Sequence, residues 1–249
     1  MQPFCIALAT LAMSLAVAPA AAQGTAKIDA GAAGGSGSDW ASFVPPTDGT
    51  FSTFGETAPD IGLVKRMFHL MYAEECSWSL GGATAGEDPD VYDLSYRYGY
   101  ETEADAEHQL KLYRFFCNSG AYNEVHVYLT WDASWGLRPV SFAQPSLDIR
   151  YENEDALEGA VMGISIDGYS ATQTLVNSDF DPAAGAIISW SHWRGLGDAS
   201  SSGTYSFREG SFVLTRYIAD PSYDGEINPL VILDLTAPTS LELVPAEVD

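Results

Sequence analysis

Residues 124–131 read EVHVYLTW, and this stretch decides the fold class. Apolar and more polar side chains alternate along it, so Val125, Val127, Leu129 and Trp131 fall on one side of an extended chain. Strict alternation predicts a strand with one buried face. The same alternation recurs in five segments that we also predict to be strands: SLDIRY (146–151), MGISID (162–167), AIISWSHW (186–193), TYSF (204–207) and SFVLTRY (211–217).

Turns rich in Asn, Asp, Gly and Pro separate these segments, without long helical stretches between them. Parallel strands need long crossover connections, so neighbouring strands are expected to pair antiparallel. The last two segments are expected to form a hairpin that turns through residues 208–210. We therefore predict a mainly β protein: an antiparallel sheet, sandwich or open barrel with one N-terminal helix.

The best helix signal is IGLVKRMFHLMYAEE at residues 61–75, directly after Asp60. The Asp60 carboxylate can cap the first turn. Spacings of three and four residues place four apolar side chains on one face, which we expect to be buried: Leu63, Met67, Leu70 and Met71. A second, short helical turn is expected at Thr102, which resembles a capping box with Asp105.

Residues 1–22 are typical of a secretory signal peptide, with an apolar run followed by three alanines at 20–22. We expect cleavage after Ala22 and a periplasmic or extracellular protein. Residues 23–39 are rich in Gly, Ala and Ser, which is typical of a flexible leader. Residues 40–249 are expected to form a single β-rich domain without a membrane span.

The chain carries 11 Lys and Arg against 34 Asp and Glu, a formal net charge of −23. Such a surface repels phosphate backbones and anionic lipid heads, so nucleic acid is not expected as a partner, whereas a basic protein is attracted. Beyond the signal peptide the sequence holds two cysteines, Cys76 and Cys117. An isolated pair in an oxidising compartment normally forms a disulfide, which we predict here.

Motifs of the common hydrolases and of zinc sites are missing from the sequence. The string nearest to a serine-hydrolase elbow, residues 163–168, continues as a strand pattern rather than a helix. The four histidines are scattered, without the short spacings that zinc sites use. Carboxylates are so numerous that no glycosidase pair stands out. We therefore predict no catalytic residue, no cofactor and no zinc.

One acidic loop partly matches a calcium-binding pattern. Asp220, Ser222 and Asp224 place oxygens at the first, third and fifth positions of an EF-hand-like loop, and Gly225 stands at the sixth. The twelfth position holds Val231 instead of a bidentate Glu. A calcium site and an ordinary acidic turn are the two alternatives, and we favour the turn.

The stretch WRGLGDASSSG at residues 193–203 also admits two interpretations. Its glycines and hydroxyls suit an elaborate connection between two strands, and they also suit a loop that holds a ligand. Arg194 can clamp Asp198 or a carbonyl, or it can bind a carboxylate or phosphate of a ligand. Arg194 and Asp198 are therefore the candidate residues for a structural or ligand-binding role.

Two segments of the sequence carry a family resemblance. Cys117 is followed by Gly-Ala-Tyr-Asn at 120–123, and Arg-Gly-Leu-Gly-Asp at 194–198 is followed by an aromatic strand and Phe-Val-Leu at 212–214. In this pattern, over about residues 107–235, the chain resembles an exported bacterial family of unknown function, numbered 1176. The family pattern has two further cysteines that this sequence lacks. Ala199-Ser200 stands at the position of the first, and Tyr223-Asp224-Gly225 stands at or next to the position of the second. The resemblance implies a periplasmic, β-rich protein and carries no activity or catalytic residue.

These features predict a non-enzymatic binding or interaction module of the cell envelope, whose partner is an envelope protein or a small ligand. The alternatives are a carboxylate-dependent envelope hydrolase and an acidic inhibitor of a basic cell-wall hydrolase. A hydrolase needs carboxylates that converge in a pocket, one of them strongly desolvated, whereas a binding module does not.

Overall fold

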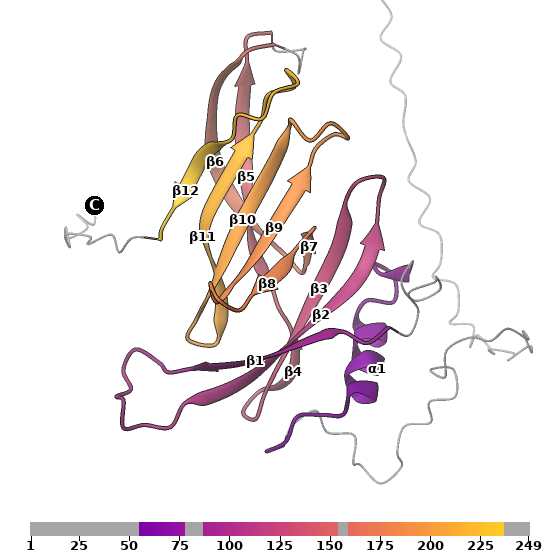
Figure 1. The fold of residues 1–249 in the computed structure, drawn as a ribbon, viewed down its shortest axis with the longest axis vertical. Helices are drawn as coiled ribbons and strands as arrows, with labels where there is room; N and C mark the ends of the chain where they lie inside the picture. Colours follow the sequence, from indigo (N-terminus) through magenta and orange to yellow (C-terminus); the bar gives the residue numbers. More distant parts are fainter. Residues whose placement is uncertain (1–54, 78–86, 154–158, 237–249) are drawn as a thin grey trace, which may run out of the picture. The chain divides into compact units, whose positions relative to one another are not determined.

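The computed structural model describes residues 55–77, 87–153 and 159–236. They form two five-stranded antiparallel sheets, a two-stranded hairpin and one helix (Figure 1). The predicted mainly β, antiparallel fold with one N-terminal helix is confirmed, and the strand orders of the described residues leave both sheets open. The predicted signal peptide and leader lie outside the described residues.

The first sheet has the order β1-β2-β3-β4, and β7 also pairs with β3, on a different stretch from β4. Its strands are β1 (Asp90–Tyr96), β2 (His108–Ser119), β3 (Glu124–Asp132), β4 (Gly136–Pro139) and β7 (Thr174–Val176). The second sheet has the order β12-β11-β10-β9-β8. Its strands are β8 (Asp179–Asp181), β9 (Ala186–His192), β10 (Ser200–Arg208), β11 (Ser211–Asp220) and β12 (Leu230–Asp234).

The remaining elements are helix α1 (Ile61–Met71) and the hairpin of β5 (Phe142–Tyr151) and β6 (Val161–Thr172). The helix begins where predicted, because the Asp60 Oδ1 accepts a hydrogen bond from the backbone N–H of Leu63 at 3.0 Å. The predicted hairpin between β10 and β11 is confirmed. Its turn residues, Glu209 and Gly210, both have positive φ, as the tight turn of a two-residue hairpin requires.

Of the predicted apolar face of α1, only Met67 packs against the buried cluster under the helix. Val64 and Phe68 are buried, whereas Leu70 is 67% exposed. The helix lies against the first sheet, where the rings of Phe68 and Phe115 stack with centroids 4.3 Å apart. Apolar residues cover the whole side of this helix that lies opposite Lys65, Arg66 and His69. Their spacing therefore allowed more than one buried stripe, and the packing of Phe68 on the sheet selected this one.

The predicted disulfide between Cys76 and Cys117 is confirmed. It joins the segment that follows α1 to β2, inside a cluster of buried side chains between the helix and one face of the first sheet. The helix is therefore attached to the sheet both by apolar packing and by a covalent bond.

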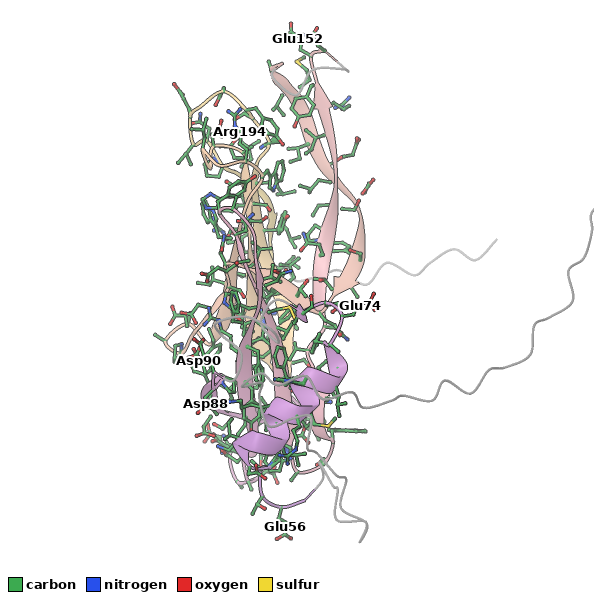
Figure 2. All side chains as sticks on the ribbon, turned by 90° about the vertical axis from the view of Figure 1, so that its right-hand side faces the viewer. Glu56, Glu74, Asp88, Asp90, Glu152 and Arg194 are labelled. Atoms are coloured by element: carbon green, nitrogen blue, oxygen red, sulfur yellow. A yellow bond between two sulfur atoms is a disulfide. The ribbon has the colours of Figure 1, made fainter. Side chains whose placement is uncertain are left out.

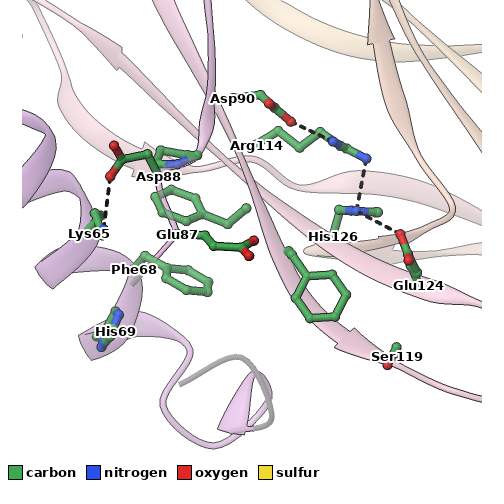
Figure 3. Close-up of a pocket in the computed structure, with 13 residues that line it drawn as sticks. Lys65, Phe68, His69, Glu87, Asp88, Asp90, Arg114, Ser119, Glu124 and His126 are labelled. Carbon is green, nitrogen blue, oxygen red and sulfur yellow. Dashed lines mark hydrogen bonds and ion pairs between the residues drawn. The ribbon is translucent and has the colours of Figure 1, made fainter. Parts of the chain in front are cut away.

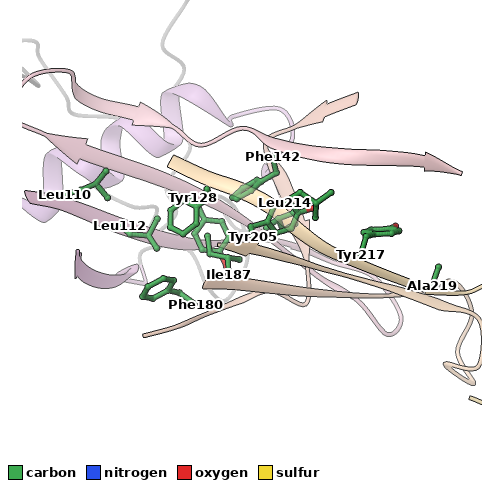
Figure 4. Packing of buried hydrophobic residues seen from close by; sticks show 12 residues of the cluster. Leu110, Leu112, Tyr128, Phe142, Phe180, Ile187, Tyr205, Leu214, Tyr217 and Ala219 are labelled. Atoms are coloured by element: carbon green, nitrogen blue, oxygen red, sulfur yellow. The ribbon is translucent and has the colours of Figure 1, made fainter. Parts of the chain in front are cut away.

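Strand β3 is confirmed, but the prediction that only one of its faces is buried is wrong. Val127 and Leu129 pack in the cluster with the helix, whereas Tyr128 belongs to a second cluster on the other face (Figure 4). That cluster also takes residues from the second sheet and from β5, among them Ile187, Tyr205 and Phe142. The first sheet is thus covered on both faces, so β3 needs buried residues on both.

The structure differs from the sequence predictions at two places between α1 and β2. Strand β1 is not among the predicted strands; it begins at Asp90, in an acidic segment, and pairs with β2. At Thr102 the expected capping contacts form, since its N–H and hydroxyl donate to Asp105 Oδ2 at 2.7 and 2.8 Å. They close a turn and no helix follows, because the chain continues directly into β2.

Candidate functional site

A cavity of about 400 Å³ lies where α1, the start of β1 and the end of β2 meet, and we call it the helix-edge cavity (Figure 3). Strand β1 pairs with β2 only as far as Arg114, so in the described part of the chain residues 115–119 have no strand on that edge. The cavity is lined by Lys65, Phe68, His69, Glu87, Asp88, Pro89, Asp90, Arg114, Phe115, Phe116, Ser119, Glu124 and His126.

Arg114 is the centre of the polar contacts beside this cavity. Its Nη1 donates to Asp90 Oδ2 at 2.7 Å, and its Nε donates to the carbonyl of Ser178 at 2.8 Å. Its Nη2 lies 3.0 Å from Nε2 of His126. These contacts connect β1, β3 and the β7–β8 connection through one guanidinium, which fixes its orientation.

The His126 imidazole is neutral at physiological pH. Its side chain is only 4% exposed, and burial together with the charge of Arg114 lowers its pKa to about 4. A neutral ring that faces a guanidinium N–H accepts at Nε2, so the ring proton sits on Nδ1. This Nδ1 is buried and has no hydrogen-bond partner among the described residues. The Glu124 carboxylate, 3.9 Å from Nε2, therefore faces an uncharged ring.

The charges around the helix-edge cavity do not balance. Lys65 pairs with Asp88 at 3.0 Å, and Arg114 pairs with Asp90 at 2.7 Å. Glu87 has no ion pair with any described residue, and Glu124 meets only the neutral His126. The cavity therefore carries two uncompensated carboxylates beside three phenylalanine rings.

The structure brings the predicted residues Arg194 and Asp198 together. Arg194 Nε donates to Asp198 Oδ1 at 2.7 Å, and its Nη2 contacts Asp198 Oδ2 and donates to the carbonyl of Tyr223 at 2.8 Å. Asp198 is 1% exposed and also accepts from the N–H of Gly225 at 2.9 Å. The Arg194 guanidinium holds the pKa of Asp198 well below its usual range. Both carboxylate oxygens are occupied, so the geometry favours a structural clamp between two loops.

The two segments of the family resemblance lie next to each other. The Asn123 Nδ2 donates to the carbonyl of His192 at 2.9 Å, across 69 residues of chain. Asn123 Oδ1 accepts from Asn177 Nδ2 at 2.8 Å. The ring of Tyr122 covers Gly195, where an added Cβ would lie 3.5 Å from it. Two loops that are distant in sequence therefore form one polar end of the fold.

The loop with the calcium-like pattern uses its oxygens internally. Asp220 is 1% exposed and accepts from the N–H and hydroxyl of Ser222 at 3.1 and 2.6 Å, and from the N–H of Asn228. Asp224 Oδ1 accepts from the N–H of Glu226 at 2.9 Å. Within the described ranges, no group of three His, Cys, Asp or Glu side chains is arranged to hold a metal ion. The geometry favours the acidic turn.

The buried carboxylates have structural partners. Asp132 accepts from the backbone N–H groups of Ser134 and Trp135 at 2.9 and 2.8 Å and pairs with Arg138, while Asp198 and Asp220 are occupied as described. The carboxylates of the helix-edge cavity are largely exposed instead, with 56% for Asp90 and 63% for Glu124. The carboxylates that line this cavity therefore differ from the buried ones in being open to solvent.

The helix-edge cavity is not among the sequence predictions. One signal was available: Arg114 stands between aromatic residues in LKLYRFF (110–116), where a cation needs a partner once it is buried. The identity of that partner, and the open edge of β2 beside it, depend on where β1 begins.

No family model, curated protein or solved structure matches the chain. Among the helices of the described residues, none is long and apolar enough to cross a membrane. The resemblance to the exported family numbered 1176 stays a prediction, and the function has to be argued from the site itself.

Proposed function

We propose that the protein is an exported, non-enzymatic module of the cell envelope that binds a basic protein partner at the helix-edge cavity. The observation that carries the proposal is the pair of uncompensated carboxylates, Glu87 and Glu124, beside three phenylalanine rings. A Lys or Arg side chain fits such a lining, because its charge pairs with carboxylates and is also attracted to aromatic ring faces.

The charge of the whole chain supports this proposal. Among the described Lys and Arg residues, seven form ion pairs with carboxylates of the same molecule: Lys65, Arg97, Lys111, Arg114, Arg138, Arg194 and Arg216. Exposed carboxylates such as Glu56, Glu74 and Glu152 lie at separate places along the fold (Figure 2). The field towards solvent is therefore negative, which speeds the approach of a basic partner.

Export is supported by the disulfide and by the signal-peptide pattern of residues 1–22. Disulfides form and persist in oxidising compartments such as the periplasm. N-terminal sequencing of the protein recovered from the envelope of an expressing bacterium tests this part. We expect the mature chain to begin at Gln23, and recovery of the chain only in the cytoplasm would contradict export.

The binding proposal is tested with a decalysine peptide and a charge-neutral double variant, Glu87→Gln with Glu124→Gln. Calorimetry at low salt is expected to show affinity for the peptide that falls by about tenfold or more in this variant. The matched control is Glu152→Gln with Asp167→Asn, which removes the same charge from the β5–β6 hairpin. Figure 2 shows Glu152 far from Asp88 and Asp90 at the cavity.

The two double variants distinguish binding at the helix-edge cavity from attraction by the net charge of the whole protein. If both lose affinity equally, the peptide is held by net charge alone and the cavity is not the binding site. If the wild-type protein shows no affinity for decalysine at low salt, the proposal of a basic partner is wrong.

A further inference from the structure

A second cavity, of about 440 Å³, is bordered by the β5–β6 hairpin, by β7 and by the second sheet. From the sheet it is lined by Ser189, Ser191 and Trp193 at β9, by Ser201 and Gly203 of β10, and by Tyr217 of β11. We call it the serine groove. It includes Trp193, Ser201 and Gly203 of the WRGLGDASSSG stretch, and it shares no lining residue with the helix-edge cavity.

The serine groove exists because of a change in side-chain size along one face of the sheet. Ile187 and Tyr205 pair across β9 and β10, and both are fully buried in the core. The next pairs on the same face are Ser189 with Gly203 and Ser191 with Ser201. The Tyr205 ring packs over Gly203, whereas the small side chains of Ser189, Ser191 and Ser201 leave space beside it.

The walls of the groove are held in place by hydrogen bonds between hairpin and sheet. Gln144 Nε2 donates to the Tyr217 hydroxyl at 3.3 Å, and the Tyr205 hydroxyl donates to the carbonyl of Ala143 at 3.3 Å. The indole N–H of Trp193 donates to Ser201 Oγ at 3.2 Å, which fixes this ring at the wall. The groove is therefore preformed, and its volume is in the range of about 300–1,000 Å³ that small-molecule sites occupy.

The lining excludes two classes of ligand. None of the residues that line the groove is charged, although the chain has 34 acidic residues. An ionic ligand would therefore be desolvated without a counter-charge. A purely apolar ligand is also a poor fit, because it would cover hydroxyls such as that of Ser191, which has no hydrogen-bond partner among the described residues.

We propose that the serine groove binds a neutral saccharide. A pyranose combines hydroxyls, which match Ser189, Ser191 and Gln144, with apolar C–H faces, which pack on aromatic rings such as Trp193 and Tyr217.

The test is calorimetric titration of the full protein with cellotetraose, maltotetraose and chitotetraose. We expect binding of at least one of them, and a loss of about tenfold or more in affinity when Ser191→Leu fills the groove. Ser202→Leu is the matched control: Ser202 is the neighbour of Ser201 on the opposite face of β10 and pairs with Trp190. Melting temperatures of both variants show that each is folded.

The proposal is overturned if none of the three saccharides binds, or if Ser191→Leu and Ser202→Leu weaken binding equally. Preferential binding of a neutral tetrapeptide such as tetraserine would also overturn it. The result is independent of the helix-edge cavity, because Glu87→Gln with Glu124→Gln is expected to leave saccharide affinity unchanged.

Discussion

Arg114 and Arg194 each join separate parts of the chain, but they do so in different chemical settings. Arg194 makes a two-point contact with one buried carboxylate, whereas Arg114 divides its donors among a carboxylate, a carbonyl and a neutral imidazole. The Asp198 charge is therefore compensated within its loop, and His126 keeps a buried N–H without a partner among the described residues.

Replacement of Arg194 by Ala is expected to lower the melting temperature by several degrees, because Asp198 would stay buried without its counter-charge. Arg194→Lys keeps the charge but loses the two-point contact, so its melting temperature should lie in between. Scanning calorimetry measures the effect. The control is Arg208→Ala, which removes an exposed guanidinium that has no ion pair with any described residue. Equal melting temperatures for Arg194→Ala and this control would refute the clamp.

His126 is expected to make stability depend on pH between about 6.5 and about 4. In this window the unfolded chain binds a proton at His126 that the folded protein does not, because burial and Arg114 oppose the charge more than Asp179 and Asp90 favour it. The free energy of unfolding therefore falls as the pH falls, by at most about 3 kcal/mol from this group.

His126→Gln tests this prediction, since a Gln can still accept from Arg114 and does not titrate. Urea denaturation at a series of pH values is expected to show a smaller decrease in stability between pH 6.5 and 4 for the variant than for the wild-type protein. Parallel profiles for the two proteins would mean that other groups cause the acid sensitivity.

At the scale of elements, helix α1 depends on its attachment to the first sheet. It is 11 residues long, which is marginal for an isolated helix in water, and Val64 and Phe68 are its only fully packed side chains. The disulfide holds the segment after the helix against β2. The helix and the helix-edge cavity that it borders are therefore expected to form or to loosen together.

The double variant Cys76→Ser with Cys117→Ser is expected to lose roughly 4 kcal/mol of unfolding free energy, because the unfolded chain gains the freedom of a loop of 41 residues. Urea denaturation under non-reducing conditions measures this loss. Addition of dithiothreitol to the wild-type protein should reproduce it and should leave the variant unchanged. A variant as stable as the wild-type protein would show that packing alone holds the helix.

At the scale of the whole molecule, the net charge of −23 opposes the compact state. The surface ion pairs offset little of this repulsion, since exposed pairs contribute about 0–1 kcal/mol each. The melting temperature is therefore expected to rise as NaCl increases from about 0.01 to about 0.5 M, because the Debye length shortens from about 30 Å to a few Å.

Thermal scans in NaCl, MgCl2 and CaCl2 of equal ionic strength measure this effect. We expect calcium and magnesium to act alike, because the oxygens of the 220–224 turn are already engaged. A rise with calcium that magnesium does not reproduce would instead show a calcium site at Asp220, Ser222 and Asp224. A melting temperature that falls with NaCl would mean that ion pairs dominate.

The sequence by itself determined the antiparallel β class, the start of α1 and the disulfide. Each depends on short-range or covalent chemistry: the period-two alternation at 124–131, the capping carboxylate of Asp60, and a single pair of cysteines after residue 22. These properties are readable in one stretch of chain without knowledge of what packs against it.

Only the tertiary structure decided which face of α1 is buried, that β3 is covered on both sides, and where the two cavities lie. Each of these depends on which surfaces meet. Phe115 selects Phe68 over Leu70, the second sheet buries Tyr128, and the start of β1 at Asp90 leaves the helix-edge cavity open. The serines of β9 and β10 look like ordinary strand residues until their cross-strand pairing places them together.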